Sequence, residues 1–364
     1  MAGKRLAILG SRGIPARYGG FETFAEELST RLVSAGVDVT VFCEKTQADG
    51  ADEYRGVKLE YVRVAGLGPL TTILFDLRCL LLARKGYDIV YMLGYGASPF
   101  CFLPRLWGSQ VWINMDGVEW ARSKWSGLAK FWFRLCEASA LYTATRILAD
   151  AEAIKTHIAS RHRRTGTYSV IPYGAEIVSS DPESRPLDAF DLRPYEYYLI
   201  VCRLEPENHV LEIVQGFLSS DSEVPLVIVG NHEVSSKYVE SLLEYECDRI
   251  LFVGPVFDKV TLRALRFYCR GYFHGHSVGG TNPSLLEALG AGNPVFAHDN
   301  VFNREVAGVF GRYFSDIADI PILVADFEAD FVPGAARQRA WEIVRSRYTW
   351  EIVTRKYLAL LETS

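Results

Sequence analysis

The strongest constraint in this sequence is an alternation of short apolar segments with amphipathic segments, which runs along the chain and then begins again. Leu6–Gly10 is an apolar run, and Phe21–Ala35 then places apolar residues at helical spacing, with Gly36 as a stop. Further strands are predicted at Val37–Phe42, Ile89–Leu93, Val111–Asn114, Ile147–Ala149 and Tyr168–Ile171. Strands that alternate with helices predict right-handed βαβ units and a parallel sheet.

The alternation restarts after the irregular, proline-containing stretch Ser179–Pro194, which we interpret as an interdomain linker. Strands are predicted at Tyr197–Cys202, Leu226–Gly230, Ile250–Val253, Gly271–His274 and Pro294–Ala297, and helices at Leu211–Leu218, Ser235–Glu246, Lys259–Cys269 and Pro283–Leu289. Ala335–Thr363 is nearly continuous helix, broken around Tyr348-Thr349. We therefore expect an α/β protein with two doubly wound, Rossmann-like domains, residues 1–180 and 181–340, facing across a cleft. The pattern leaves open where the final helix, 341–364, packs, and the first domain is one option.

Composition excludes several classes of protein. With 364 residues, 49% hydrophobic, the chain can bury two cores, and its net charge of −5 argues against a nucleic-acid partner. The 7 cysteines are scattered and form no CxxC pair, which indicates reduced thiols and no zinc site. No signal peptide is expected before Leu6, and the apolar stretch Leu70–Ala83 is too short to span a bilayer. We expect a cytoplasmic protein, soluble or peripheral to a membrane.

The loop after the first predicted strand contains Gly10, Gly13, Gly19 and Gly20 together with Arg12 and Arg17. Glycines let backbone amides approach a ligand closely, and the following helix directs its positive end at the loop. The arginines suit a phosphate or a carboxylate. The dinucleotide fingerprint GxGxxG is absent, so the alternatives are an anion-binding loop of another kind and a tight turn that is merely rich in glycine.

Carboxylates follow a later strand of the first half. Asp116 and Glu119 lie three residues apart directly after Val111–Asn114. Such a pair can supply a general base and a partner for sugar hydroxyls, because ionised oxygens accept short hydrogen bonds. The alternative is that Asp116, which precedes glycine, only turns the chain.

In the second half, Arg203 follows the first strand, and a glycine pair opens a helix that has Asn282 at its cap and Pro283 in its first turn. An arginine holds a diphosphate well, and the exposed amides of the helix suit a phosphate. Glu287 lies on the same helix. His274 and His276 have no third ligand nearby in the pattern, so no metal site is predicted.

The motifs Arg203-Leu-x-Pro-Glu and Asn-Pro-Ser-Leu-Leu-Glu-Ala-Leu-Gly-Ala-Gly-Asn-Pro-Val at 282–295 resemble the donor signature of GT-B glycosyltransferases of family 4. The N-terminal Gly-Ile-Pro-Ala-Arg-Tyr-Gly-Gly-Phe-Glu-Thr and the Asp-Gly-Val-Glu-Trp at 116–120 are similar to bacterial rhamnosyltransferases that build cell-wall and capsular polysaccharides on lipid carriers.

The resemblance implies a GT-B fold, with an acceptor-side domain at 1–180 and a nucleotide-sugar donor domain at 181–340. It implies a retaining, metal-independent reaction without a cofactor. The catalytic candidates that it implies are Asp116, Glu119 and Arg203. The donor-binding candidates are Arg12, Arg17, Gly19, Gly20, Arg203, Asn208, Gly279, Gly280, Thr281, Asn282 and Glu287.

Two positions depart from the family pattern. The usual lysine five residues after Arg203 is Asn208, so another positive group, such as Arg12 or Arg17, must compensate at the diphosphate. The first glutamate of the E-x7-E motif is Gly279, which removes a carboxylate that normally binds a hydroxyl of the donor sugar. A 6-deoxy donor is consistent with that loss.

Aromatic and basic residues crowd part of the first half. They are Trp107, Trp112, Trp120, Trp125, Phe131, Trp132 and Phe133, with Arg122, Lys124, Lys130 and Arg134 between them. Such a segment suits a membrane interface, and a helix with an aromatic core face is an equal alternative. The run Arg161-His162-Arg163-Arg164 is interpreted as a solvated loop, with a contact to anionic lipid as the alternative.

The sequence thus predicts a peripheral glycosyltransferase that transfers L-rhamnose from dTDP-rhamnose to a lipid-linked saccharide. The alternatives are a UDP- or GDP-sugar donor, an NAD-dependent sugar-nucleotide oxidoreductase with Glu44 at the ribose, and a sugar-nucleotide-binding protein without turnover.

Overall fold

The computed structural model describes residues 3–16, 19–45, 50–64, 66, 70–122, 125–162, 166–233 and 236–364. The chain divides into two compact units. Unit 1 consists of Met1–Tyr173 and Trp350–Ser364, and unit 2 consists of Gly174–Thr349. The α/β class predicted from the alternating pattern is confirmed, with a parallel sheet in each unit.

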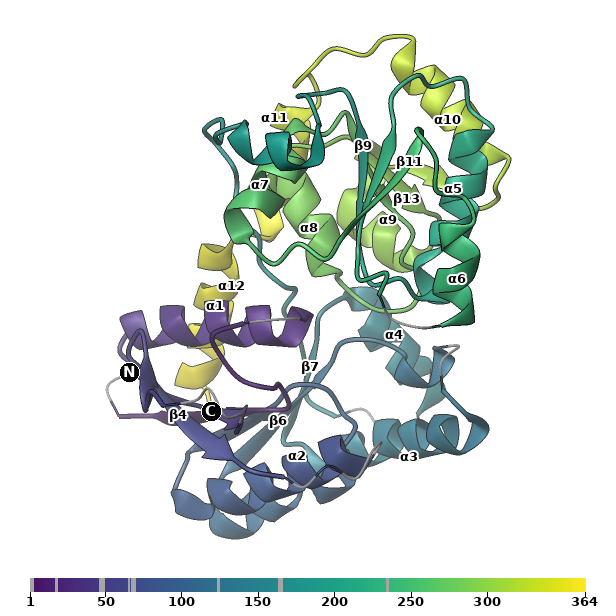
Figure 1. Ribbon diagram of the computed structural model, residues 1–364. Helices are drawn as coiled ribbons and strands as arrows, with labels where there is room; N and C mark the ends of the chain where they lie inside the picture. Colours follow the sequence, from purple (N-terminus) through teal and green to yellow (C-terminus); the bar gives the residue numbers. More distant parts are fainter. Residues whose placement is uncertain are drawn as a thin grey trace. The chain divides into compact units, whose positions relative to one another are not determined.

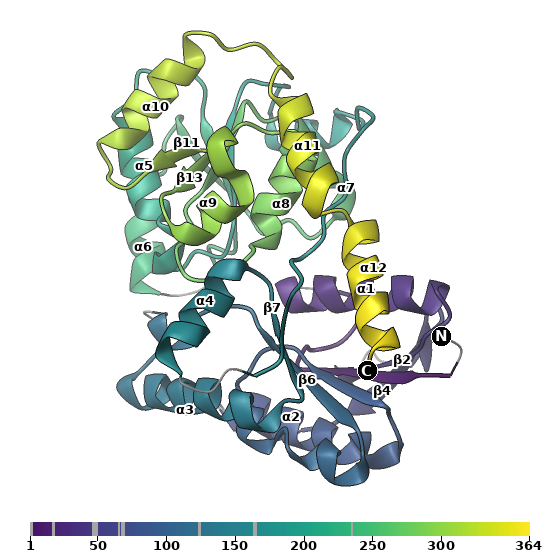
Figure 2. The same cartoon turned by 180° about the vertical axis from the view of Figure 1, so that it is seen from behind.

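Unit 1 is built on a sheet whose described strands run in the order β3-β4-β2-β1-β5-β6-β7-β8, all parallel except the β3–β4 pair. The strands are β1 (Arg5–Leu9), β2 (Asp38–Glu44), β3 (Glu53–Tyr54), β4 (Val57–Val62), β5 (Ile89–Met92), β6 (Gln110–Met115), β7 (Arg146–Ala149) and β8 (Tyr168–Val170). The helices are α1 (Gly20–Ser34), α2 (Leu70–Leu82), α3 (Gly127–Thr143), α4 (Glu152–Arg161) and α12 (Trp350–Glu362). Figures 1 and 2 show α1 and α2 on opposite sides of this sheet.

The C-terminal helix α12 belongs to unit 1, where it packs on α1. The Phe24 ring of α1 lies 6.0 Å from the Tyr357 ring of α12, and the Tyr91 hydroxyl of β5 is 2.8 Å from the Tyr357 hydroxyl. These rings are buried, so the last helix completes the core of the first half of the chain.

Unit 2 contains a parallel sheet in the order β11-β10-β9-β12-β13-β14. The strands are β9 (Tyr198–Val201), β10 (Leu226–Val229), β11 (Ile250–Gly254), β12 (Gly271–His274), β13 (Val295–His298) and β14 (Arg312–Phe314). The helices are α5 (Val210–Leu218), α6 (Lys237–Leu243), α7 (Lys259–Tyr268), α8 (Pro283–Gly290), α9 (Val301–Ala307), α10 (Asp319–Glu328) and α11 (Arg337–Arg347). Both views show α5, α6 and α10 on one face of this sheet and α7, α8 and α11 on the other (Figures 1 and 2).

The unit boundaries differ from the expected domain boundaries at 180/181 and 340/341. The stretch Ser179–Pro194, which we interpreted as a linker, lies inside unit 2. It contains a short 3₁₀ helix, η5 (Arg185–Phe190), and buries Leu187 and Leu192 in a cluster with Tyr197. The segment therefore packs on the core of unit 2 through its apolar side chains. Helix α11 also belongs to unit 2.

The β3–β4 hairpin was not predicted. Its two turn residues, Arg55 and Gly56, have φ values of 51° and 84°, which is typical of the tight turn that matches strand twist. The two-residue strand β3 is too short to show an alternating pattern, so only the turn could have signalled it.

Candidate functional site

The glycine-rich loop after β1 packs tightly against neighbouring strand ends. A Cβ atom on Gly10 would lie 2.1 Å from the Leu93 carbonyl oxygen, and one on Gly13 would lie 2.5 Å from the Cys43 sulfur. Both residues have positive φ, of 87° and 114°. A side chain at either position would clash with a neighbouring strand end, so glycine is required at both whether or not the loop binds a ligand.

The rest of this loop is open to solvent. Gly19 and Gly20 are exposed just before and at the start of α1. The Arg12 side chain is 80% exposed, and its nearest carboxylate is Glu44, at 3.9 Å. Such a loosely held guanidinium is available to an anion. Arg17 lies outside the described residues.

Asp116 lies at the same sheet edge, directly after β6. It is partly buried, and together with burial its charge raises the pKa of Tyr95, which follows β5. The Tyr95 hydroxyl accepts a hydrogen bond from the Glu119 backbone N–H (2.7 Å) and donates one to the Gly117 carbonyl (3.2 Å). Tyr95 was not singled out in the sequence, yet it fixes the loop that carries Asp116.

Glu119 is held by its own neighbours. Its Oε1 is 2.8 Å from the Arg122 Nε, and its Oε2 accepts a hydrogen bond from the Trp125 indole (3.2 Å). Because both carboxylate oxygens have protein partners, this geometry favours a role in shaping the loop over a role in chemistry.

The loop is also anchored through Trp120, whose indole donates to the Glu137 Oε2 at 2.7 Å. Glu137 is 2% exposed and also binds the His162 ring (2.8 Å) and the Arg161 Nε (3.2 Å). Burial alone raises the pKa of Glu137, but the hydrogen bonds from His162 and Trp120 and the Arg161 charge outweigh it and hold that pKa below its ordinary value. The described part of the basic run, Arg161 and His162, is thus bound to a buried carboxylate.

In unit 2, the Arg203 loop after β9 meets the loop after β12, because these strands are neighbours. A Cβ atom on Gly275 would lie 1.9 Å from the Asn208 carbonyl oxygen, so only glycine permits this approach. The Asn208 amide donates to the Arg203 carbonyl (2.7 Å), and its Oδ1 lies 2.8 Å from the His276 Nδ1. Asn208 is buried and joins the two loops.

The Arg203 guanidinium is 47% exposed, and its nearest carboxylate, Glu205, is 3.8 Å away. Helix α8 begins beside it: Asn282 caps the helix by accepting from the Ser284 N–H (2.9 Å), and the Ser284 hydroxyl donates to the Val201 carbonyl at the end of β9 (2.8 Å). The guanidinium of Arg203 and the amino end of α8 therefore occupy the same edge of the sheet.

Glu287 lies on α8, with Oε2 2.6 Å from an Arg266 nitrogen. Gly279, Gly280 and Thr281 are buried in the loop before the helix.

Histidines gather at this edge, and the sequence singled out only some of them. His209, which precedes α5, stacks on His298 at 4.2 Å and binds Glu212 (3.2 Å) and Ser277 (3.0 Å). Burial lowers the pKa of His274 to about 3. The signal for His298 was its place at the end of a predicted strand. Among the residues that the structure describes, no group of three or more His, Cys, Asp or Glu is placed to hold a metal.

None of the helices in the described part of the chain has both the length and the apolar character that a membrane crossing requires. All seven cysteines lie in that part and are free thiols.

Comparison with known proteins places this geometry in a structural class. A family described as "Domain of unknown function (DUF1972)" matches residues 3–176. No curated protein matches the sequence. Sucrose-phosphate synthase from Thermosynechococcus elongatus is 18% identical, with a TM-score of 0.78 over 99% of this chain and 100% of that chain. HepE from Anabaena, in complex with UDP-glucose, is 16% identical, with a TM-score of 0.75 over 99% and 100%.

A glycosyltransferase from Rickettsia africae is 13% identical, with a TM-score of 0.75 over 99% of this chain and 97% of that chain. At these identities the likeness establishes the fold. The chain has the GT-B fold that the motifs implied.

Proposed function

We propose that this protein is a retaining glycosyltransferase that transfers a sugar from a nucleotide-sugar donor to a lipid-linked saccharide in bacterial surface polysaccharide synthesis. The observation that carries the proposal is the carboxyl edge of unit 2, where a half-exposed arginine, paired only at 3.8 Å with Glu205, adjoins the start of a capped helix. Both groups attract a diphosphate, since a guanidinium binds phosphate oxygens in bidentate fashion and helix amides add a positive end.

In this proposal Arg203 binds the donor diphosphate and stabilises the charge that develops on it as the sugar departs. Glu287 binds the ribose hydroxyls. Its Oε2 is tied to Arg266, and the side chain is 36% exposed, which leaves part of the carboxylate to a ligand. The Gly279–Asn282 loop contacts the sugar and phosphates, and Arg12, Arg17, Gly19 and Gly20 are further donor-binding candidates.

We propose dTDP-rhamnose as the donor. Gly279 provides no carboxylate where the family binds a sugar hydroxyl, which favours a 6-deoxy sugar. UDP-sugars are the competing class, since HepE was solved with UDP-glucose. An NAD-dependent oxidoreductase is not favoured, because the similar solved structures include a glycosyltransferase and a protein in complex with UDP-glucose.

Asp116 is the group that we place near the acceptor hydroxyl, since it is partly buried at the carboxyl edge of unit 1 beside Tyr95. A retaining reaction requires the diphosphate to leave and the acceptor to attack on the same face of the sugar. The positive groups that stabilise the leaving diphosphate are side chains and helix amides, so no metal or cofactor is needed in this scheme.

Donor binding and transfer can be measured with Arg203→Ala, Glu287→Ala and the control Arg263→Ala, an exposed arginine on α7. We expect dTDP-rhamnose to raise the melting temperature of the native protein and of the control, and to have little effect on the other two variants. Transfer to a lipid-linked saccharide should fall by roughly 100-fold or more, given the worth of one charge-stabilising donor in catalysis. Full transfer by both site variants would contradict the donor assignment, and a larger response to a UDP-sugar would replace the donor.

We also propose that α3 lies against the membrane that carries the acceptor. Apolar residues recur on its outer side at Leu128, Phe131, Leu135 and Tyr142, with exposures of 81, 67, 47 and 58%. The only acidic residue of the helix, Glu137, is buried, whereas Arg134 is exposed. An exposed apolar stripe flanked by positive charge suits an anionic lipid surface.

Some aromatic residues of this segment pack inside unit 1. Trp112 is fully buried in β6, and the Trp132 indole donates to the Gly96 carbonyl (3.1 Å).

The double variant Leu128→Gln/Phe131→Gln should sediment less with vesicles that contain anionic lipid, whereas Ile322→Gln, an exposed apolar residue of unit 2, should not. Equal sedimentation of all three proteins would contradict the membrane contact.

A further inference from the structure

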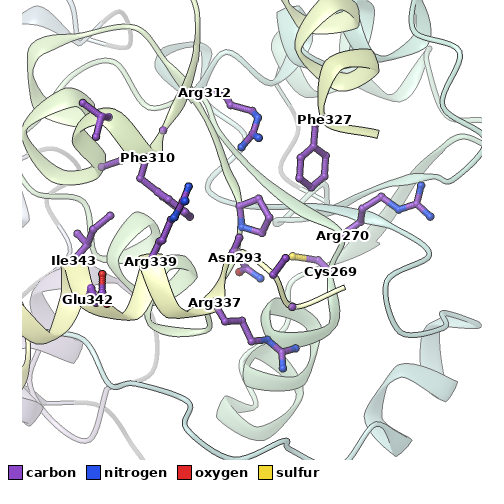
Figure 3. A pocket seen from close by; sticks show the side chains of 18 of the residues that line it. Cys269, Arg270, Asn293, Phe310, Arg312, Phe327, Arg337, Arg339, Glu342 and Ile343 are labelled. Carbon is purple, nitrogen blue, oxygen red and sulfur yellow. The ribbon is translucent and has the colours of Figure 1, made fainter. Parts of the chain in front are cut away.

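A pocket lies in unit 2, at the edge of the sheet opposite to Arg203. Its walls come from the residues just before β12, β13 and β14, and from α11 and the end of α10 (Figure 3). Its volume is about 1190 Å³, above the ~300–1,000 Å³ typical of small-molecule sites. Strands of four residues separate it from the Arg203 edge by roughly 13 Å, at about 3.3 Å per residue. It is therefore distinct from the proposed donor site.

Arginines line this pocket, and most of them have protein partners. Arg270 pairs with Glu328 (3.1 Å), Arg337 pairs with Asp181 (3.6 Å), and Arg347 donates to the Glu305 carbonyl (3.1 Å). These three side chains line the pocket, and their hydrogen-bonding groups already have protein partners.

Arg312 differs from them. It begins β14, and its guanidinium lies 4.9 Å from the Phe327 ring centre and 5.8 Å from that of Phe296. Within the described residues it makes no ion pair and no hydrogen bond. Asp326 attracts it only at longer range, and burial lowers the pKa of Arg312. Cation–π contacts with two rings offset part of the free energy of hydration that the guanidinium loses on burial. They accept no hydrogen bonds from its N–H groups.

Arg339, on α11, is the other arginine of the pocket with no ion pair or hydrogen bond among the described residues. Figure 3 shows the Arg312 and Arg339 side chains directed into the same space. Three acidic residues, Asp326, Asp330 and Glu342, also line the pocket and are exposed. They exclude a large polyanion, while their carboxylates are suited to hydroxyl groups.

We propose that this pocket binds a small phosphorylated saccharide, with its phosphate on Arg312 and Arg339 and its hydroxyl groups on Asp330 and Glu342. The phosphate supplies acceptors for the free guanidinium donors, and the sugar supplies donors for the acids. The binding site belongs to unit 2 alone and does not depend on the donor at the opposite edge.

The test uses the full chain and glucose 6-phosphate as the probe, with glucose and inorganic phosphate as separate arms. Calorimetric titration and melting temperature should both report binding of glucose 6-phosphate, at least 10-fold tighter than either arm. Arg312→Met should abolish the response, and Arg345→Met, an exposed arginine on the same helix as Arg339, should retain it. Arg203→Ala should also retain it, which separates this site from the proposed donor site.

Arg312→Met keeps an apolar side chain beside the two phenylalanine rings, so the melting temperature without ligand should stay equal or rise. A fall would show that the cation also stabilises the fold through the rings, and the binding comparison then uses Arg339→Met. No response to millimolar glucose 6-phosphate, or an equal response to inorganic phosphate, would overturn the proposal. If Arg312→Met does not fold, Arg339→Met provides the same comparison, and an unchanged affinity there would count against the site.

Discussion

Asp76 is a buried carboxyl group whose ionisation should set the pH dependence of the stability of unit 1. It lies on α2, is 7% exposed, and its Oδ1 has no hydrogen-bond partner among the described residues. Burial raises the pKa of Asp76 from 3.8 to about 7. In the unfolded chain the carboxyl releases its proton near pH 4, whereas the native state keeps it until about pH 7.

The sign of the effect follows from the proton count. Between pH 4 and pH 7 the native state binds one more proton than the unfolded state, so the free energy of unfolding falls by about 1.4 kcal/mol per pH unit. Over about three units the loss is about 4 kcal/mol, and it persists above pH 7. Asp76→Asn carries no such charge. At pH 8 it should therefore be more stable than the native protein by up to about 4 kcal/mol, and at pH 4 the two should be equal.

Urea unfolding of both proteins from pH 4 to pH 8 measures this difference, with Asp52→Asn, an exposed aspartate of the same unit, as the control. The control should follow the native protein at every pH. Parallel curves for Asp76→Asn and the native protein would refute the reasoning, because they would mean that the carboxyl is solvated in the folded state.

Three further outcomes are expected. Gly275→Ala should weaken nucleotide-sugar binding by more than 10-fold, because its Cβ would lie 1.9 Å from the Asn208 carbonyl, whereas Gly127→Ala, with nothing within 4 Å, should bind normally in the same titration. Glu137→Gln should destabilise unit 1 by roughly 1–3 kcal/mol at pH 7 in urea unfolding, because it removes a buried carboxylate's charged hydrogen bonds, while its partner Arg161 is 38% exposed. Because the pKa of Glu137 is lowered, this loss should shrink as the pH falls below the ordinary carboxyl value of 4.5, and a constant loss would speak against an ionic contribution. Cys247 is the one exposed thiol of the seven cysteines; Cys202 is partly buried and the other five are buried. A thiol reagent should therefore modify one group rapidly in the native protein, and Cys247→Ser should remove that phase; a fast phase that survives would contradict this order of exposure.

The elements that local pattern determines were predicted closely. The strand at Gly271–His274 has the predicted bounds, and the helix predicted at Pro283–Leu289 ends one residue later, at Gly290. Both signals are local: a run of aromatic residues after glycine marks the strand, and an Asn-Pro cap marks the helix start. The break in the last helical segment, expected at Tyr348-Thr349, separates α11 from α12.

The partners of the charged residues were decided by tertiary structure. Sequence placed Glu287 and Asn208 in the donor loops, but it had no means to show that one would pair with Arg266 and the other would hold His276. The Asn208–His276 contact joins segments 68 residues apart and exists because β9 and β12 are neighbours in the sheet, whereas the Glu287–Arg266 pair joins the helices α8 and α7.

Periodicity and capping depend on residues within a few positions of each other, so the order of helices and strands, the fold class and the loops at strand ends could be inferred from the chain alone. Burial, ion pairing and the free guanidinium of Arg312 depend on which strands become neighbours and which side chains lose water. Those properties arise only when the sheets have formed, because desolvation and hydrogen-bond geometry are set by atoms far away in sequence.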